Sequence, residues 1–339
     1  MTPVLLSDRP TSLVALPPED ATRRKFITSV GAAALAAAFL AACGDDEAAG
    51  ETPESAPSTR EVSHEFGTTA IPVDPQRIAV VDVRSIENLV ALGIIPQAVF
   101  TKPVAHVADQ LDGVTVLETA EGEVDLELLA QIEPDLILAW GNFIEETRDQ
   151  IAQIAPLVGV RHEQFNDWKG SLRDLARIMD REEQAEAAIA AFEARAADIA
   201  GRIEAAGLDQ LTVSVIRGIT DGFRLAAANE SFPAPILDEA GLTRTDVQRN
   251  TPTDFGEISL SLEQTAQAEA DIIIVVHRAP GENPAQAEAL EEMMTSPLWQ
   301  TLTAAKEGRV YDVSIDHWLQ GGPIAANLIL DDIERHLLG

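Results

Sequence analysis

The sequence contains an internal repeat, and this repeat limits the possible architectures more than any other feature. The stretch Asp125–Trp140 aligns without a gap with a second copy that lies within Leu260–Val276, 136 positions later. The identical pairs include Leu126 with Leu262, Glu127 with Glu263, Ala130 with Ala266, Gln131 with Gln267, Glu133 with Glu269, and Asp135 with Asp271. Similarity at a fixed offset favours two lobes that are built on one plan.

Each copy predicts a short helix followed by a buried parallel strand. In the first copy, apolar residues recur at helical spacing at Leu126, Leu129 and Ile132, and both copies end in an apolar run bounded by an acidic residue. Glu127 and Glu263 fall in the first turns of these helices. The helix dipole alone accounts for a carboxylate there, so a structural role and a functional role both remain open for the two residues.

Composition excludes several classes of partner. The chain has 339 residues, room for two domains, and 46% of them are hydrophobic. A formal net charge of −32 argues against nucleic acid and against an anionic membrane face, and it suits a basic partner or high salt. With only one cysteine, the chain can form neither a disulfide framework nor a thiolate-rich zinc site.

The N-terminal 42 residues predict an export signal. A basic start at Arg23, Arg24 and Lys25 precedes an apolar run too short to span a membrane, and it resembles a twin-arginine signal. The sequence Leu-Ala-Ala-Cys-Gly around Cys43 resembles a bacterial lipobox, which implies cleavage before Cys43 and lipid attachment to its sulfur. The alternative is an ordinary buried cysteine. Residues 43–60 are acidic and poor in apolar side chains, so we expect a disordered tether there.

The remaining chain predicts an α/β fold in three parts. Residues 61–168 should form an N-terminal lobe that opens with a hairpin turning at Gly67, and residues 208–339 should form a C-terminal lobe. In both, apolar strand patterns alternate with helical ones, which predicts mainly parallel sheets with flanking helices. Between them, residues 169–207 contain no proline and predict one long helix, capped by Ser171 and ended by Gly207. Such a helix, on the order of 50 Å long, can bridge both lobes.

No motif for catalysis or for a resident metal is present. The sequence has no glycine-rich phosphate loop, nucleophile elbow, His-Glu-x-x-His or Cys-x-x-Cys motif. Its six histidines are scattered rather than grouped at the spacing of metal ligands. These absences make an enzyme or a zinc or manganese binder less favoured.

Basic and aromatic residues follow the predicted strands of both lobes. Ligands of open α/β sheets collect beyond the carboxyl ends of the strands. Guanidinium groups bind carboxylate or catecholate oxygens and indoles cover apolar faces, so these positions predict a cleft for a bulky anion. The candidate ligand-binding residues are Arg84, Trp140, Arg217, Arg224, His277, Arg278 and Trp318.

Each candidate also has a structural explanation. The arginines could form salt bridges with the many carboxylates, which are common and weak at surfaces. Trp140 and Trp318 could pack in the core. A lone histidine such as His277 or His317 is weak evidence for a ligand contact.

Several longer stretches together resemble the substrate-binding lipoproteins of bacterial ABC importers for iron-siderophore complexes. These are periplasmic binding proteins of the helical-backbone type, and they are related to the vitamin B12 and haem binders. The resemblance covers almost all of the mature chain. It rests on residues 64–82, 91–99, 124–138, 296–313 and 321–333.

The resemblance implies two α/β lobes joined by one long rigid helix, with a ligand cleft between them and small closure on binding. It also implies one permease-docking glutamate on each lobe, and Glu127 and Glu263 match these by their place in the Leu-Glu motif. The expected protein is a lipid-anchored monomer outside the cytoplasmic membrane. It carries no cofactor other than the lipid, captures an Fe(III)-siderophore, hands it to the permease and performs no chemistry.

Four alternatives remain open. The nearest are a cobalamin or haem binder of the same fold. A ligand-sensing lipoprotein and an exported hydrolase belong to other classes, and a hydrolase would need a nucleophile and a base within hydrogen-bond reach.

Overall fold

The computed structural model describes residues 58–161, 166–227, 230–253, 256–278 and 281–339. Its first element is the predicted hairpin, in which β1 (Thr59–His64) pairs antiparallel with β2 (Gly67–Pro72). Gly67 has a φ of 125°, which side-chain-bearing residues rarely adopt. β1 begins two residues before the predicted start of the lobe. The export signal, Cys43 and most of the tether lie outside the described residues.

The first lobe is built on a five-stranded parallel sheet in the order β5-β4-β3-β6-β7. Its strands are short and mostly buried, as expected for a sheet covered on both faces. The strands are β3 (Ile78–Val80), β4 (Ala98–Val99), β5 (Thr115–Val116), β6 (Leu136–Ala139) and β7 (Leu157–Gly159). The helices are α1 (Ser85–Ala91), α2 (Ala105–Ala108), α3 (Leu126–Ile132), the 3-10 turn η1 (Gly141–Phe143) and α4 (Arg148–Ile151).

The second lobe is built on a mixed sheet in the order β11-β9-β8-β12-β13, with β10 also paired to β8. β8, β10, β12 and β13 are parallel, whereas β9 and β11 are antiparallel to their neighbours. The strands are β8 (Thr212–Ile219), β9 (Gly222–Ala226), β10 (Thr243–Arg244), β11 (Glu257–Leu260), β12 (Ile272–His277) and β13 (Val310–Ser314).

Helices connect and follow the strands of this second sheet, and one of them, α12 (Pro323–Ile333), packs back against the first lobe. They are α7 (Pro233–Glu239), α8 (Asp246–Asn250), the 3-10 helix η3 (Leu262–Ala268), α9 (Pro284–Thr295), η4 (Trp299–Thr301), α10 (Thr303–Glu307), α11 (Ile315–Trp318), α12 (Pro323–Ile333) and the π-helix η5 (Glu334–Leu338). α12 packs against α1, α5, α6 and α7. Pro323 occupies its first turn, where a missing N–H costs nothing.

The predicted single helix over residues 169–207 is wrong, because the segment forms two helices. α5 (Trp168–Met179) and α6 (Glu182–Ala205) meet at Asp180, whose φ of 52° is left-handed. Such a residue ends a helix, and aspartate tolerates this conformation better than most side chains. α5 also starts earlier than predicted, since Asp167 rather than Ser171 caps it through the Gly170 N–H. The predicted stop is confirmed, with Gly207 left-handed at a φ of 69° before the short turn η2 (Leu208–Gln210).

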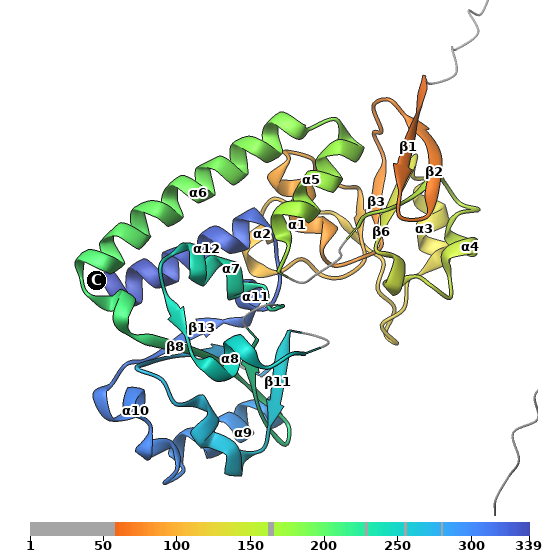
Figure 1. Ribbon diagram of the computed structural model, residues 1–339. Coiled ribbons are helices and arrows are strands. Elements are labelled where there is room, and N and C mark those ends of the chain that lie inside the picture. The colour runs from red at the N-terminus through yellow and green to blue at the C-terminus, as the bar shows by residue number, and fades with distance from the viewer. Residues whose placement is uncertain (1–57, 162–165, 228–229, 254–255, 279–280) are drawn as a thin grey trace, which may run out of the picture. The chain divides into compact units, whose positions relative to one another are not determined.

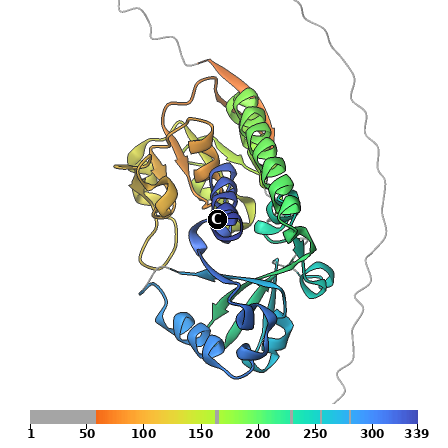
Figure 2. The same ribbon diagram turned by 90° about the vertical axis from the view of Figure 1, so that its left-hand side faces the viewer.

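Ion pairs hold α6 against its neighbours. Arg195 donates to the Asn327 carbonyl and to the carboxylates of Asp331 and Glu334 at the C-terminal end of α12. Figure 1 and Figure 2 both show α6 running alongside α12. Near Arg195 on α6, Glu193 pairs with Lys169 of α5, whose Nζ lies 2.8 Å from carboxylate oxygens of both Glu193 and Glu239. Burial lowers the pKa of Lys169, but these hydrogen bonds outweigh it and leave the pKa raised.

The repeat corresponds to equivalent places in the two sheets. The first copy forms α3 and β6, and β6 is the neighbour of β3; the second copy forms η3 and β12, and β12 is the neighbour of β8. Side chains alternate between two cores in both strands, as successive strand residues face opposite sides. Leu138 and Ile274 belong to one core shared by both lobes, whereas Ile137 and Ile273 each belong to a core confined to one lobe.

The aspartate that starts each repeated strand has the same function in both lobes. Asp135 accepts hydrogen bonds from the backbone N–H groups of Gln76 and Arg77, at 2.9 Å each, just before β3. Asp271 accepts hydrogen bonds from the N–H and the hydroxyl of Thr212, at 2.8 Å each, where β8 begins. These bonds lower the pKa of Asp271. Each carboxylate therefore anchors the start of the neighbouring strand.

Candidate ligand-binding cleft

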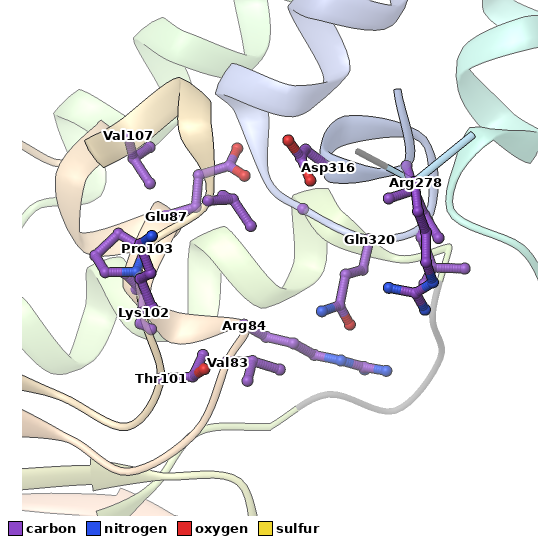
Figure 3. Close-up of a pocket in the computed structure, with 15 residues that line it drawn as sticks. Val83, Arg84, Glu87, Thr101, Lys102, Pro103, Val107, Arg278, Asp316 and Gln320 are labelled. Carbon is purple, nitrogen blue, oxygen red and sulfur yellow. The ribbon is translucent and has the colours of Figure 1, made fainter. Parts of the chain in front are cut away.

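A cavity of about 170 Å³ is bordered by residues of both lobes. Figure 3 shows Arg84 and Gln320 reaching into it from different parts of the chain, with Arg278 on the side of the second lobe. Its lining residues are Val83, Arg84, Ile86, Glu87, Thr101, Lys102, Pro103, Val104, Val107, Arg278, Ile315, Asp316, Leu319, Gln320 and Gly321. The first-lobe members follow β3 and β4, so the cavity lies at the carboxyl edge of that sheet, where ligands of α/β folds bind.

Arg84 and Trp140 form a cation–π pair at this edge. The guanidinium carbon of Arg84 lies 4.4 Å from the centre of the Trp140 ring, and the two residues follow the adjacent strands β3 and β6. Burial lowers the pKa of Arg84 to about 10, against the opposing effect of Asp82. Arg84 thus stays charged at neutral pH. Asp82 also accepts the N–H groups of Arg84 and Ser85, which fixes the start of α1.

A larger cavity of about 410 Å³ adjoins the first and shares Leu319 and Gln320 with it. Arg217 of β8 forms a fork with the carboxylate of Glu257 through its Nε and its Nη2, the latter 2.5 Å from Oε2. Arg224 of β9 donates to the same Oε2 at 2.8 Å. The remaining lining residues are Val215, Ile216, Ala226, Ser231, Phe232, Pro233, Gly256, Ser259, Val276 and Trp318.

The two cavities together are cationic in a strongly acidic chain. Arg84, Lys102, Arg217, Arg224 and Arg278 line them, opposed by Glu87, Asp316 and Glu257, which leaves a formal charge of +2. Clefts that concentrate one sign of charge raise the local concentration of ligands of the opposite sign. The arrangement suits an anion with several oxygen atoms and some apolar surface.

Glu87 connects the two lobes beside the first cavity. Its buried carboxylate accepts hydrogen bonds from the N–H groups of Gly322 and Ala325 at 2.9 and 2.8 Å, which caps the start of α12. The other oxygen lies 3.0 Å from Nε2 of His106. A Cβ at Gly322 would lie 2.2 Å from Oδ1 of Asn88, so a larger residue there would displace the Asn88 side chain. A negative group at a helix start is favourable.

The predicted candidates divide between these cavities and a separate groove. Arg84 and Arg278 line the first cavity, and Arg217 and Arg224 line the second while also forming the salt bridges of the alternative interpretation. Trp140 lies against Arg84.

Two candidates have other main contacts. Trp318 borders the second cavity but is only 2% exposed, and its indole N–H donates to Asp332 at 2.7 Å. This confirms the core interpretation for most of its surface. His277 pairs with Asp312 at 2.7 Å and lines neither of the two cavities. It borders a groove beside β13 and a smaller cavity of about 60 Å³ that Arg217 and Arg278 also line.

Sequence reasoning missed several polar lining residues. Lys102 follows the strand β4 just as Arg84 follows β3, so the same strand-end rule could have found it. Gln320 immediately precedes Gly321 and Gly322, which begin the stretch 321–333 of the family resemblance. Glu257 had no comparable signal, because it begins an antiparallel edge strand rather than ending a parallel one.

The two glutamates of the repeat are both exposed in the first turns of their helices. Asp125 caps α3 by accepting the N–H of Leu128, and Ser261 forms a capping box with Gln264 at η3. The pKa of Glu263 is lowered by its own backbone N–H and by the Ser261 hydroxyl. Neither glutamate lines the two cavities, so both are accessible to a partner.

The described residues contain no group of three or more histidine, cysteine, aspartate or glutamate side chains that could hold a metal ion. In the same part of the chain, no helix is both long enough and apolar enough to cross a membrane.

Comparisons with known sequences point to one family. A family model described as periplasmic binding protein matches residues 78–315. The lipoprotein YfiY of Bacillus subtilis, named a "Probable siderophore-binding lipoprotein", is 30% identical over 330 residues, covering 93% of this chain and 99% of that protein. The achromobactin-binding periplasmic protein of Dickeya dadantii is 28% identical over 272 residues, covering 77% and 86%.

Solved structures show the same fold. Staphylococcus aureus SirA complexed with staphyloferrin B superimposes with a TM-score of 0.72 at 24% identity, over 83% of this chain and 99% of that one. The siderophore periplasmic binding protein from the fuscachelin gene cluster of Thermobifida fusca gives a TM-score of 0.64 at 26% identity, over 79% and 98%. With its two sheets, its cleft and the family match over residues 78–315, the chain belongs to the periplasmic binding protein family.

Proposed function

We propose that this protein is the lipid-anchored substrate-binding component of an ABC importer, which captures a ferric siderophore and delivers it to a permease. The observation that carries the proposal is the pair of adjoining cavities with five cationic side chains on a chain of net charge −32. Relatives named for siderophore or achromobactin binding support the ligand class. The protein would perform no chemistry of its own.

The proposed ligand contacts come from both lobes. Arg84 and Arg278 would bind anionic oxygens in the first cavity, while Arg217 and Arg224 would do so in the second. Trp140 would cover an apolar part of the ligand from beside Arg84. Trp318 would contribute only the edge that borders the second cavity. His277 would contact only a ligand that extends to the groove beside β13 or to the smaller cavity that it shares with Arg217 and Arg278.

Anchoring and docking complete the proposal. Residues 1–42 would act as the export signal, Cys43 would carry the lipid, and residues 43–60 would tether the protein outside the cytoplasmic membrane. Relatives named as lipoproteins support the anchor. Glu127 and Glu263, one per lobe and both exposed, would pair with arginines on the permease while the protein acts as a monomer.

A fluorescence titration tests the ligand class. Of the four tryptophans, Trp168, Trp299 and Trp318 are at most 3% exposed, so Trp140 should report most of the change on binding. We expect ferric citrate-type or catecholate complexes to bind with a Kd below roughly 10 μM. The signal should be lost in Trp140→Phe, while calorimetry still detects binding.

The same experiment can reject the proposal. If no ferric complex binds below that concentration, the protein is not a siderophore binder. A purified protein that retains a coloured pigment with a haem or cobalamin spectrum would favour the nearest alternative instead.

A further inference from the structure

Glu257 lies between two arginines that the sheet places directly opposite each other. β8 and β9 pair antiparallel, with Arg217 opposite Arg224, and β11 adds Glu257 at the edge beside β9. Opposed residues of an antiparallel pair have Cβ atoms roughly 5 Å apart, and like charges there repel. The carboxylate of Glu257 contacts both guanidinium groups and offsets this repulsion.

The three side chains already display a carboxylate-binding geometry. Two donors of Arg217 form a fork on one carboxylate and Arg224 adds a third hydrogen bond. This is the arrangement in which arginine recognises carboxylates. Both Arg217 and Glu257 are largely shielded from water, with side chains 12% and 14% exposed, so screening by solvent is reduced.

The arginine pair retains capacity for a ligand. Arg224 donates to Glu257 through Nη1, and its side chain is still 36% exposed, so an incoming anion can reach it. All three side chains line the second cavity. With Glu257 ionised, the group carries a charge of +1 rather than +2, so an incoming anion meets both attraction from the arginines and repulsion from Glu257.

We propose that Glu257 is a specificity-determining residue, which sets how negative a ligand the cleft retains. Its carboxylate occupies part of the arginine pair and thereby weakens the binding of highly anionic ligands relative to neutral ones of similar size. The role of Glu257 in the choice of siderophore rests on the proposed function, whereas the effect of Glu257 on the binding of anions does not.

Glu257→Gln is the direct test, because glutamine keeps the shape and removes the charge. The probes are metal-free citrate, a ferric citrate complex and a neutral ferric trihydroxamate, measured by calorimetry at fixed low salt. We expect both citrate probes to bind about tenfold more tightly, because a neighbouring like charge has been removed in a partly shielded site. The neutral complex should change by less than about twofold.

Glu186→Gln provides a matched control. Glu186 also accepts a fork from one arginine, Arg173, at 2.6 and 3.0 Å, but it lies on the exposed face of α6 and lines neither cavity. It should leave the affinity for all three probes unchanged.

The like-charged arginines could destabilise the fold of Glu257→Gln. The same substitution is therefore also made in the variant Arg224→Gln. In Arg224→Gln no like-charged pair remains, so Arg224→Gln can be compared with Arg224→Gln/Glu257→Gln. Loss of Glu257 should again strengthen citrate binding. If removal of Glu257 leaves citrate affinity unchanged or weaker in both backgrounds, Glu257 only positions the arginines and the proposal is overturned.

The outcomes separate this proposal from the proposed function. If citrate binds more tightly to Glu257→Gln but no ferric complex binds to any variant, the role of Glu257 stands and the siderophore function fails. If ferric complexes bind but their preference does not depend on Glu257, the function stands and the role of Glu257 fails.

Discussion

The two lobes begin from the same repeated stretch but differ in what surrounds it. In both, the repeat supplies a first-turn glutamate, a buried strand and an aspartate that anchors the neighbouring strand. Beyond that neighbour, the first sheet continues with the parallel strands β4 and β5, whereas the second continues with the antiparallel strands β9 and β11. The second lobe therefore has an arginine pair with a carboxylate between its members, and the first has Arg84 against Trp140.

This difference separates the residues that build the two sheets from those that line the cavities. The repeated residues build the sheets and present Glu127 and Glu263 on the surface, and they are the same in both copies. The groups that face the cavities lie mostly outside the repeat, so each half of the cleft can change without disturbing the frame. The proposed ligand contacts are therefore positions added to a shared scaffold.

Reversing the charge of both repeated glutamates should have the largest effect. We expect Glu127→Arg/Glu263→Arg to reduce uptake at least about 100-fold, because like charges would then meet at the permease. Ligand affinity should be unchanged, since neither residue lines the cavities. Radiolabelled iron uptake by cells and titration of the purified variant measure the two quantities.

The single reversals compare the two copies directly. If the lobes dock equivalently, each should reduce uptake by a similar factor, and Glu204→Arg/Glu288→Arg, two exposed acids outside the repeat, should reduce it little. A loss of ligand affinity in the double variant would mean that the glutamates serve the cleft or the fold instead.

Removing either repeated aspartate, Asp135 or Asp271, should lower the free energy of unfolding by a similar, moderate amount. Asp135→Ala and Asp271→Ala each lose two hydrogen bonds to a carboxylate, so we expect the free energy of unfolding to fall by about 1–2 kcal/mol in both. Denaturant unfolding at neutral pH measures it, with the exposed Asp112→Ala as control. A large effect in only one lobe would show that the copies no longer have the same structural role.

The smallest expected effect concerns the N-terminal hairpin formed by β1 and β2. Nδ1 of His64 accepts the N–H groups of Phe66 and Gly159 at 3.2 and 3.1 Å, so the ring is bound in its neutral form. Burial, followed by the charge of Arg177, lowers the pKa of His64 below 6.5. The unfolded chain therefore takes up a proton on His64 more readily than the folded protein does. The contribution of His64 to the free energy of unfolding is thus complete above about pH 6.5, and it is lost as the pH falls toward the lower pKa of the folded state.

His64→Gln should remove this pH dependence. The difference in unfolding free energy between the wild type and the variant should shrink from pH 7.5 to pH 5. This change should be smaller than the loss of unfolding free energy in Asp135→Ala or Asp271→Ala. A difference that grows as the pH falls would show that His64 is bound as a cation.

Much of the fold followed from local patterns, and the errors have physical causes. The hairpin, the alternating strands and helices, and the equivalent positions of the two copies all follow from periodicity and turn residues. The break at Asp180 had no glycine or proline to mark it. It is stabilised by the Arg181 N–H bonded to the Ala176 carbonyl at 2.8 Å and by the ion pair of Asp180 with Arg60, 120 positions away.

The candidate cleft could be predicted only in part. The strand-end rule found Arg84, Arg217 and Arg278, which line the two cavities, because parallel strands bring their carboxyl ends to one edge. The fourth arginine, Arg224, lies within the antiparallel strand β9. The rule could not show that Trp318 turns its N–H to Asp332 or that His277 turns to Asp312, since rotamers depend on neighbours from other elements.

The sequence by itself determined the two-lobed plan, the exposed glutamates of the repeat and the excess of negative charge, because these depend on residue types and on spacings within single elements. Only the tertiary structure decided which charges share a cavity. Glu257 reaches Arg217 and Arg224 because β11 pairs with β9, and Glu87 caps α12 across 235 positions of sequence because α1 packs beside it. Such contacts form between segments distant in the chain, so no local pattern predicts them.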